Sequence, residues 1–264
     1  MNYVSFLEAY SLITILALII LAFIAGFIDA VVGGGGLIQI PALLINLSNT
    51  PLATLLGTNK IAGLAGTSIS AFQYSKKIKF DYRLLIPMAI VAALAALLGA
   101  RLVSYIPVNT LKPFILILLI AITIYTFLKK DLGSQQTKDL SFLKNLIYGC
   151  LIGAIVGFYD GFFGPGTGSF FVLGFVVVLG FPFLKASAYS KVINCMTNIG
   201  ALMVFLKQGN YLLEIAIMMA VCNIAGSLVG TSLALKKGNE FIRKIFLIIV
   251  SLLILKYGYD IFTN

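Results

Sequence analysis

Long apolar runs recur along the whole chain and restrict the folds open to it. They cover Leu12–Ile28, Leu84–Gly99, Phe114–Phe127, Leu146–Phe158, Ala216–Leu235 and Phe246–Leu255. The hydrocarbon core of a bilayer is about 30 Å thick, and a helix of roughly 20 apolar residues crosses it. Backbone amides in lipid must be bonded internally, so only helices and closed barrels span a membrane. Because the runs are continuous rather than alternating, they predict an all-α, polytopic integral membrane bundle.

Composition supports a membrane protein and argues against a nucleic-acid partner. Of the 264 residues, 60% are hydrophobic and 11% charged, whereas soluble domains carry about a quarter charged residues. The net charge of +10 comes from Lys and Arg that gather in short loops between apolar runs, as in the cytoplasmic loops of membrane proteins. We therefore expect the lipid bilayer, rather than a nucleic acid, to be the main partner; a homo-oligomer is left open.

Two glycine-rich stretches indicate an internal duplication. "GFIDAVVGGGG" spans Gly26–Gly36 and "GFYDGFFGPGTG" spans Gly157–Gly168, with Asp160 following Asp29 by 131 residues. The same offset relates Pro51 to Pro182, Lys60 to Lys191, Lys76 to Lys207 and Gly99 to Gly230. Matching charged, Pro and Gly positions at one register predicts two homologous membrane repeats, residues 1–130 and 143–264, joined by a polar linker, residues 131–142.

Each predicted repeat divides into five segments. They are Leu12–Val31, Leu37–Leu47, Leu52–Tyr74, Leu84–Tyr105 and Leu111–Leu128, then Leu143–Phe162, Ser169–Leu179, Pro182–Leu206, Leu212–Leu235 and Phe241–Ile261. The second segment of each repeat is too short to cross the bilayer alone. The sequence leaves open whether segments 37–47 and 169–179 span the membrane or re-enter it.

The positions of the basic loops favour opposite orientations for the two repeats. Loops 76–83 and 236–244 are rich in Lys and Arg, whereas their counterparts in the other repeat are not. If all five segments change sides, loops 76–83, 129–144 and 236–244 are cytoplasmic and the repeats are inverted. If the short segments are re-entrant, the repeats are parallel and loop 236–244 breaks the positive-inside rule. We favour inversion.

The glycine clusters predict broken or half-length helices. Glycine costs about 1 kcal/mol in a helix interior relative to Ala, and a broken helix in lipid must line a covered or watery cavity. The helix that follows begins with free N–H groups and a positive dipole end, which favours an anion. The candidate binding residues here are Gly33, Gly34, Gly35, Gly36, Gly164, Gly166, Thr167 and Gly168. The alternative role of these glycines is close helix packing.

The third segment of each repeat carries a buried lysine among other polar residues. Lys60 and Lys191 each lie about 13 Å along their segment, where an unpaired ammonium group costs several kcal/mol. We expect both to bind substrate, although snorkelling to an interface is the alternative. Their polar neighbours complete the predicted lining: Asn59, Thr67, Ser190, Asn194 and Asn198.

Three roles are open to Asp29 and Asp160, the acidic residues that precede the glycine clusters. They could cap a nearby helix, neutralise the lysines, or carry protons that couple to transport. Histidine is absent and the acidic residues are scattered, so nothing resembles a nucleophile–base pair or a metal-ligand set. We expect neither enzymatic activity, nor a cofactor, nor a metal.

These motifs resemble those of a known family. "GFIDAVVGGGGLIQIPALL", "LGTNKIAGLAGT" and "GFYDGFFGPGTGSFF…ASAYSKVINCMTN" are similar to the motifs of the TauE/SafE family of sulfite and sulfonate exporters, in the branch with an Asp before each glycine cluster. The resemblance implies a multi-pass bacterial inner-membrane protein that moves small sulfur-containing anions. The second cluster departs from the family's commoner run of glycines, because Pro165 and Thr167 interrupt it, so the two halves are expected to contribute unequally.

Together these features predict a secondary transporter, an exporter, for a small anion such as sulfite or an organosulfonate. The alternative is a proton-coupled transporter or channel for a cation or another small solute, with the aspartates as ligands. A membrane-embedded enzyme or an assembly partner fits the paired intramembrane charges less well.

Overall fold

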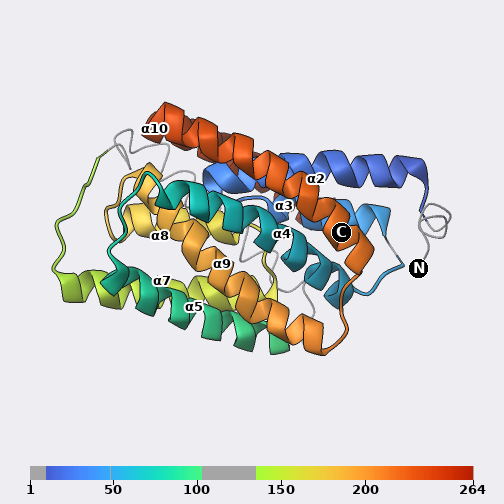
Figure 1. The fold of residues 1–264 in the computed structure, drawn as a ribbon, viewed down its shortest axis with the longest axis horizontal. Helices are drawn as coiled ribbons and strands as arrows, with labels where there is room; N and C mark the ends of the chain where they lie inside the picture. Colours follow the sequence, from blue (N-terminus) through green and yellow to red (C-terminus); the bar gives the residue numbers. More distant parts are fainter. Residues whose placement is uncertain (1–9, 48, 103–134, 264) are drawn as a thin grey trace.

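The computed structural model describes residues 10–47, 49–102 and 135–263, and every element in them is an α-helix. In chain order these are α2 (Leu12–Val32), α3 (Gly36–Asn46), α4 (Leu52–Ser75), α5 (Tyr82–Leu102), α7 (Phe142–Phe162), α8 (Thr167–Val177), α9 (Phe183–Lys207) and α10 (Leu213–Thr263) (Figure 1). Within these residues, five helices are long and apolar enough to cross a bilayer. The chain is a multi-pass helical membrane protein.

The helix boundaries agree closely with the predicted segments where the structure describes them. The short segments are helices of 11 residues each, so the half-length helices are confirmed. Helix α10 covers the last two segments of the second half, with Gly238 in a left-handed conformation (φ 70°) between them. The predicted segment Leu111–Leu128 lies outside the described residues.

The short helices turn back along the helices that precede them. Figure 1 shows α3 returning toward the end of the molecule where α2 begins, and α8 returning toward the start of α7. It also shows α2 and α7 running in opposite directions, as α4 and α9 do. The idea that re-entrant segments imply parallel halves is therefore wrong here, because α2 and α3 together form one hairpin. The inverted repeat stays a prediction, which the opposed helix directions support.

Equivalent glycines mediate equivalent helix contacts in the two halves. A Cβ atom at Gly26 would lie 2.2 Å from the carbonyl oxygen of Asn223, and one at Gly157 would lie 2.5 Å from that of Ala92. Both members of the first contact precede those of the second by the same 131-residue offset. The close-packing role proposed for spaced glycines therefore holds at α2–α10 and at α5–α7.

The described part of the polar linker is docked onto the helices rather than free of them. Lys138 Nζ donates to the carbonyl oxygens of Val177 (2.7 Å) and Val178 (3.3 Å), and Thr137 N donates to Gly180 O (2.9 Å). A lysine suits this position because the C-terminal carbonyl groups of α8 carry a partial negative charge. The linker thus holds the outer end of the α8 hairpin.

Candidate functional site

Helix α2 ends deep inside the bundle, where its last carbonyl groups need partners. The final four C=O groups of any helix lack intrahelical donors, and in a membrane bundle water is not generally present to supply them. Here each receives a side-chain donor: Lys191 Nζ at Asp29 O, Tyr74 OH at Ala30 O (3.1 Å), Ser187 Oγ at Val31 O (3.3 Å) and Ser169 Oγ at Val32 O (2.9 Å). Donors from α4, α8 and α9 therefore stabilise the break in α2.

The glycine clusters bring the beginnings of the two short helices together. Gly33, Gly164 and Gly166 have φ values of 82°, 91° and 81°, a left-handed conformation that glycine adopts without strain. Ser169 N donates to Gly33 O at 3.0 Å, and a Cβ atom at Gly33 would lie 2.2 Å from the backbone carbon of Gly168. The two breaks are thus in direct backbone contact, one from each half of the chain.

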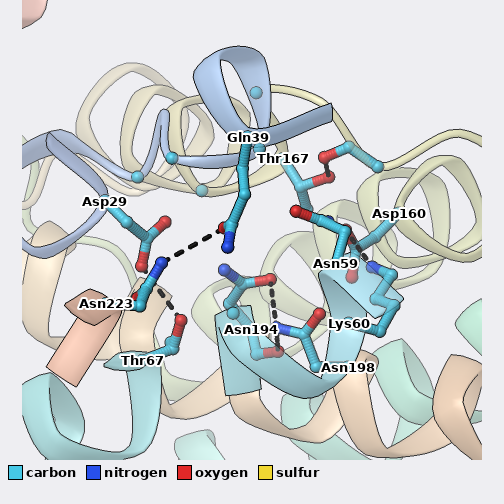
Figure 2. A pocket seen from close by; sticks show the side chains of 17 residues that line it. Asp29, Gln39, Asn59, Lys60, Thr67, Asp160, Thr167, Asn194, Asn198 and Asn223 are labelled. Carbon is cyan, nitrogen blue, oxygen red and sulfur yellow. Dashed lines mark hydrogen bonds and ion pairs between the residues drawn. The ribbon is translucent and has the colours of Figure 1, made fainter. Parts of the chain in front are cut away.

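A small cavity of about 30 Å³ lies between these breaks and the central helices α4 and α9 (Figure 2). A water molecule needs roughly 10–15 Å³ in this measure, so the cavity has room for about two waters or a small ion. Its lining consists of Asp29, Gly33, Gly35, Gly36, Gln39, Asn59, Lys60, Gly63, Thr67, Asp160, Gly164, Gly166, Thr167, Gly168, Asn194, Asn198 and Asn223. The lining is polar and comes from both halves of the chain.

Two buried ion pairs cross between the halves. Lys60 Nζ lies 2.8 Å from Asp160 Oδ1, and Lys191 Nζ lies 3.1 Å from Asp29 Oδ2. Each lysine pairs with the aspartate of the other half, and both lysine side chains are almost completely buried. Snorkelling of the lysines to an interface is therefore wrong, and neutralisation by the aspartates is what the structure shows. The four groups together carry no net formal charge.

The two lysines differ in their access to the cavity. Lys60 lines it, beside Asn59, whereas Lys191 is fully buried behind Asp29 and does not. Ser190 also lies outside the lining, because its hydroxyl donates to Gly168 O at 3.0 Å, and Gly34 is not part of it. The expectation that both lysines face the substrate is corrected: only Lys60 does.

On the opposite wall, polar side chains from α4 and α9 complete the predicted set. Thr67 Oγ1 donates to Asp29 Oδ2 at 2.9 Å, and Asn198 Nδ2 donates to the carbonyl oxygen of Asn194 at 2.8 Å. Thr167 Oγ1 donates to Gly164 O at 2.7 Å and so closes the turn that begins α8. Of the predicted side chains, all except Lys191 and Ser190 are brought to one cavity.

Sequence analysis missed two residues of the lining, Gln39 on α3 and Asn223 on α10. Asn223 Nδ2 donates to Gln39 Oε1 at 3.1 Å, and Figure 2 shows the two side chains meeting at one side of the cavity. Both are almost completely buried. Each is an amide within an otherwise apolar segment, and this is the signal that could have identified them.

The cavity also offers backbone donors. In the described part of the chain, the N–H groups of Gly35, Gly36, Gly166 and Gly168 make no backbone hydrogen bond, and all four residues line the cavity. The N-terminus of each helix carries a partial positive charge of roughly half a unit. Because the side-chain charges cancel, the two helix ends give the cavity a weakly positive character.

Comparison with known proteins identifies the family. The family model described as "Sulfite exporter TauE/SafE" matches residues 18–257. The chain belongs to the TauE/SafE family. Membership and the multi-pass fold together make this TauE/SafE protein a membrane transporter.

Individual TauE/SafE relatives match over almost the whole chain. The chain is 41% identical over 234 residues to "Probable membrane transporter protein ORF9" of Sinorhizobium sp, which covers 88% of this chain and 87% of that protein. It is 37% identical over 247 residues to "Probable membrane transporter protein YfcA" of Escherichia coli, with 92% of this chain and 89% of that protein covered. No solved structure matches the chain.

Proposed function

We propose that this TauE/SafE protein is a secondary transporter that exports a small oxyanion, sulfite or a small organosulfonate, across the bacterial inner membrane. The observation that carries the proposal is the convergence of two helix N-termini, with unbonded N–H groups, on one cavity that Lys60 lines. The cavity volume of about 30 Å³ favours a compact anion such as sulfite over a longer sulfonate. The relatives named as membrane transporters support transport in general.

In the proposed mechanism, Asp160 controls the charge that Lys60 presents. While the carboxylate is ionised, it lies 2.8 Å from the ammonium group and cancels most of its field. Asp160 Oδ2 has no hydrogen-bond partner among the described residues, so it is free to take a proton. Protonation releases Lys60 to an incoming anion, and this links one proton to one anion.

Alternating access would come from movement of one repeat, residues 1–130, against the other, residues 143–264. Both aspartate–lysine pairs join the two repeats, so a change in their charge alters the contact about which the repeats move. Lys191 and Asp29 then act as a permanent pair that holds the repeats together, and Lys60 and Asp160 as the pair that responds to substrate.

Binding of sulfite to the purified protein tests the proposal. We expect sulfite to raise the thermal unfolding midpoint in a concentration-dependent way and the Lys60→Met variant to lose this response. Lys207→Met is the matched control, because Lys207 is an exposed lysine at the end of α9. A sulfite response that survives in Lys60→Met would remove the lysine from the site.

A second candidate, transport of a small cation coupled to protons, is favoured by one observation. Asp160 Oδ2, Asn59 Oδ1 and Asn223 Oδ1 are oxygen atoms without partners in the described part of the chain, and all three residues line the cavity. Oxygen ligands of this kind suit hard cations. The same thermal-shift assay separates the two functions, because a response to alkali or alkaline-earth chlorides without one to sulfite favours the cation.

A further inference from the structure

A line of buried polar side chains leaves the central cavity along the interface between α4 and α10. On α10, Asn223, Ser227 and Thr231 recur every fourth residue, on one helix face, and all are almost completely buried. They face α4, because a Cβ atom at Gly66 would lie 1.9 Å from Asn223 Oδ1 and 2.6 Å from Ser227 Oγ. One turn further along α4 comes Ser70, which is fully buried. We call this interface the polar seam.

Several polar atoms of the seam have no partner. Within the described part of the chain, these are Asn223 Oδ1, Ser70 Oγ, Thr231 Oγ1 and Gln73 Oε1. A buried polar group without a hydrogen bond costs about 1–3 kcal/mol, and lipid provides no partner. Four such atoms in sequence along one interface therefore point to water or a polar solute as their partner.

The seam connects the central cavity to a second hollow at the end of the molecule. Asn223 lines the cavity, and the other end of the seam, at Gln73, opens into a hollow of about 460 Å³. The hollow is lined by Gln73, Lys76, Lys77, Ser232, Leu235 and Lys236. We call it the basic vestibule. Nine residues separate Asn223 from Ser232, about 13 Å along the helix.

The equivalent interface in the other half is apolar. The 131-residue offset places Ala92, Ala96 and Ala100 of α5 opposite Asn223, Ser227 and Thr231, and Ala201 of α9 opposite Ser70. All four alanines are fully buried, and α5 packs against α9 as α10 packs against α4. The polarity of the seam is therefore specific to one of two matching interfaces, and the duplicated packing does not require it.

We propose that the polar seam is a hydrated route by which the small anion of the proposed function passes between the central cavity and the basic vestibule. This inference rests on the proposed function. The three lysines of the vestibule attract and concentrate anions, and the neutral hydroxyl and amide groups of the seam replace part of their hydration without trapping them. The route leads to the end of the bundle where Figure 1 places the turn after α4 and the turn within α10.

Accessibility of single cysteines tests the route without any knowledge of the substrate. In a background with Cys150, Cys195 and Cys222 replaced by Ala, we compare Ser70→Cys and Thr231→Cys with the matched controls Ala201→Cys and Ala100→Cys. Lys77→Cys marks the face of the membrane that carries the vestibule. The probe is an anionic, membrane-impermeant methanethiosulfonate, added to either face of membrane vesicles.

We expect the probe to modify both seam cysteines from the face that modifies Lys77→Cys. Their reaction should be about tenfold faster than that of either control, because the thiolate forms poorly in dry apolar surroundings. Seam cysteines that react as slowly as the controls, in protein that still binds sulfite, overturn the route and leave the proposed function standing. Fast seam modification in protein that binds cations but not sulfite overturns the anion as the solute and with it the proposed function.

A second variant tests passage itself. Thr231→Val keeps the volume of the side chain but removes its hydroxyl group. We expect sulfite uptake into proteoliposomes to fall severalfold, while the sulfite-induced thermal shift, which reports the central cavity, is retained. Uptake at the wild-type rate would overturn the role of the seam.

Discussion

At the scale of single residues, equivalent positions have taken different tasks. Lys191 is fully buried, contacts both the carbonyl oxygen and the carboxylate of Asp29, and so holds the end of α2. Lys60 makes the equivalent ion pair with Asp160 but also lines the cavity. The hydroxyl that binds Ala30 O comes from Tyr74, whereas the position 131 residues later is Phe205. The first break is therefore capped more fully than the second, and the second is left for the ligand.

Replacement of Lys191 tests the structural pair. We expect Lys191→Met to lower the free energy of unfolding by about 3–5 kcal/mol, because it leaves the carboxylate of Asp29 buried and unpaired. The double variant Lys191→Met/Asp29→Asn should regain most of this loss, since Gly33 N still donates to Asp29 O at 2.8 Å. Unfolding in detergent measures both values. Additive losses in the double variant would mean that the two residues do not act as a pair.

Replacement of Asp160 tests the responsive pair. Asp160→Asn imitates the protonated carboxyl group, so we expect it to raise anion affinity by about tenfold, given that a charge about 4 Å away is worth ~1 kcal/mol or more. Affinity of the wild type should rise as pH falls, because protonation of Asp160 releases Lys60, and that of the variant should not change. Titration with methanesulfonate, whose own charge is constant, measures this dependence. A pH response that persists in Asp160→Asn would assign proton coupling to another group.

At the scale of helices, sequence alone gave the boundaries but not the path of the chain. Pro51 and Pro182 directly precede α4 and α9, and the glycine clusters separate α2 from α3 and α7 from α8, as local backbone preferences predict. The return of α3 along α2 could not be predicted, because the 21 residues of α2 are also enough for a complete crossing. Its direction depends on the side chains of α4, α8 and α9 that cap its end.

A pair of glycine substitutions tests the break in α2. We expect Gly33→Ala to lose more than about 2 kcal/mol of stability, because a left-handed alanine costs about 1–2 kcal/mol and its Cβ atom would lie 2.2 Å from Gly168. Gly63→Ala is the control: a Cβ atom there meets nothing within 4 Å, and alanine favours the helix by about 1 kcal/mol. Thermal unfolding of the two variants measures the difference. Equal midpoints would show that α2 does not need a glycine break.

At the scale of the whole molecule, the offset of 131 residues predicted which residues correspond but not which ones meet. It aligns Asp29 with Asp160 and Lys60 with Lys191, and it contains no information on whether pairs form within a half or between halves. The crossed pairs follow from the three-dimensional contact of the two breaks. Gln39 and Asn223, which have no polar counterpart in the other half, could not be placed in the cavity by the duplication either.

Inversion of the two halves makes a prediction about one pair of equivalent loop residues. Lys77 follows α4 and Gln208 follows α9, 131 residues later, and Figure 1 places the two turns at opposite ends of the bundle. The positive-inside rule assigns the end with Lys76, Lys77, Lys236 and Lys237 to the cytoplasm. Lys77→Cys and Gln208→Cys, each in a background without other cysteines, therefore report the orientation of one half each.

We expect an impermeant maleimide to label Gln208→Cys in intact cells and Lys77→Cys in inside-out vesicles. Lys237→Cys should behave as Lys77→Cys does, because the turn at Gly238 lies at the same end as the turn after α4. Parallel halves would place the two equivalent residues on one face, and labelling of both from that face would exclude the inverted arrangement. Opposite labelling with Lys77 outside would instead keep the inversion and reverse the orientation, so that the vestibule and the polar seam would open away from the cytoplasm.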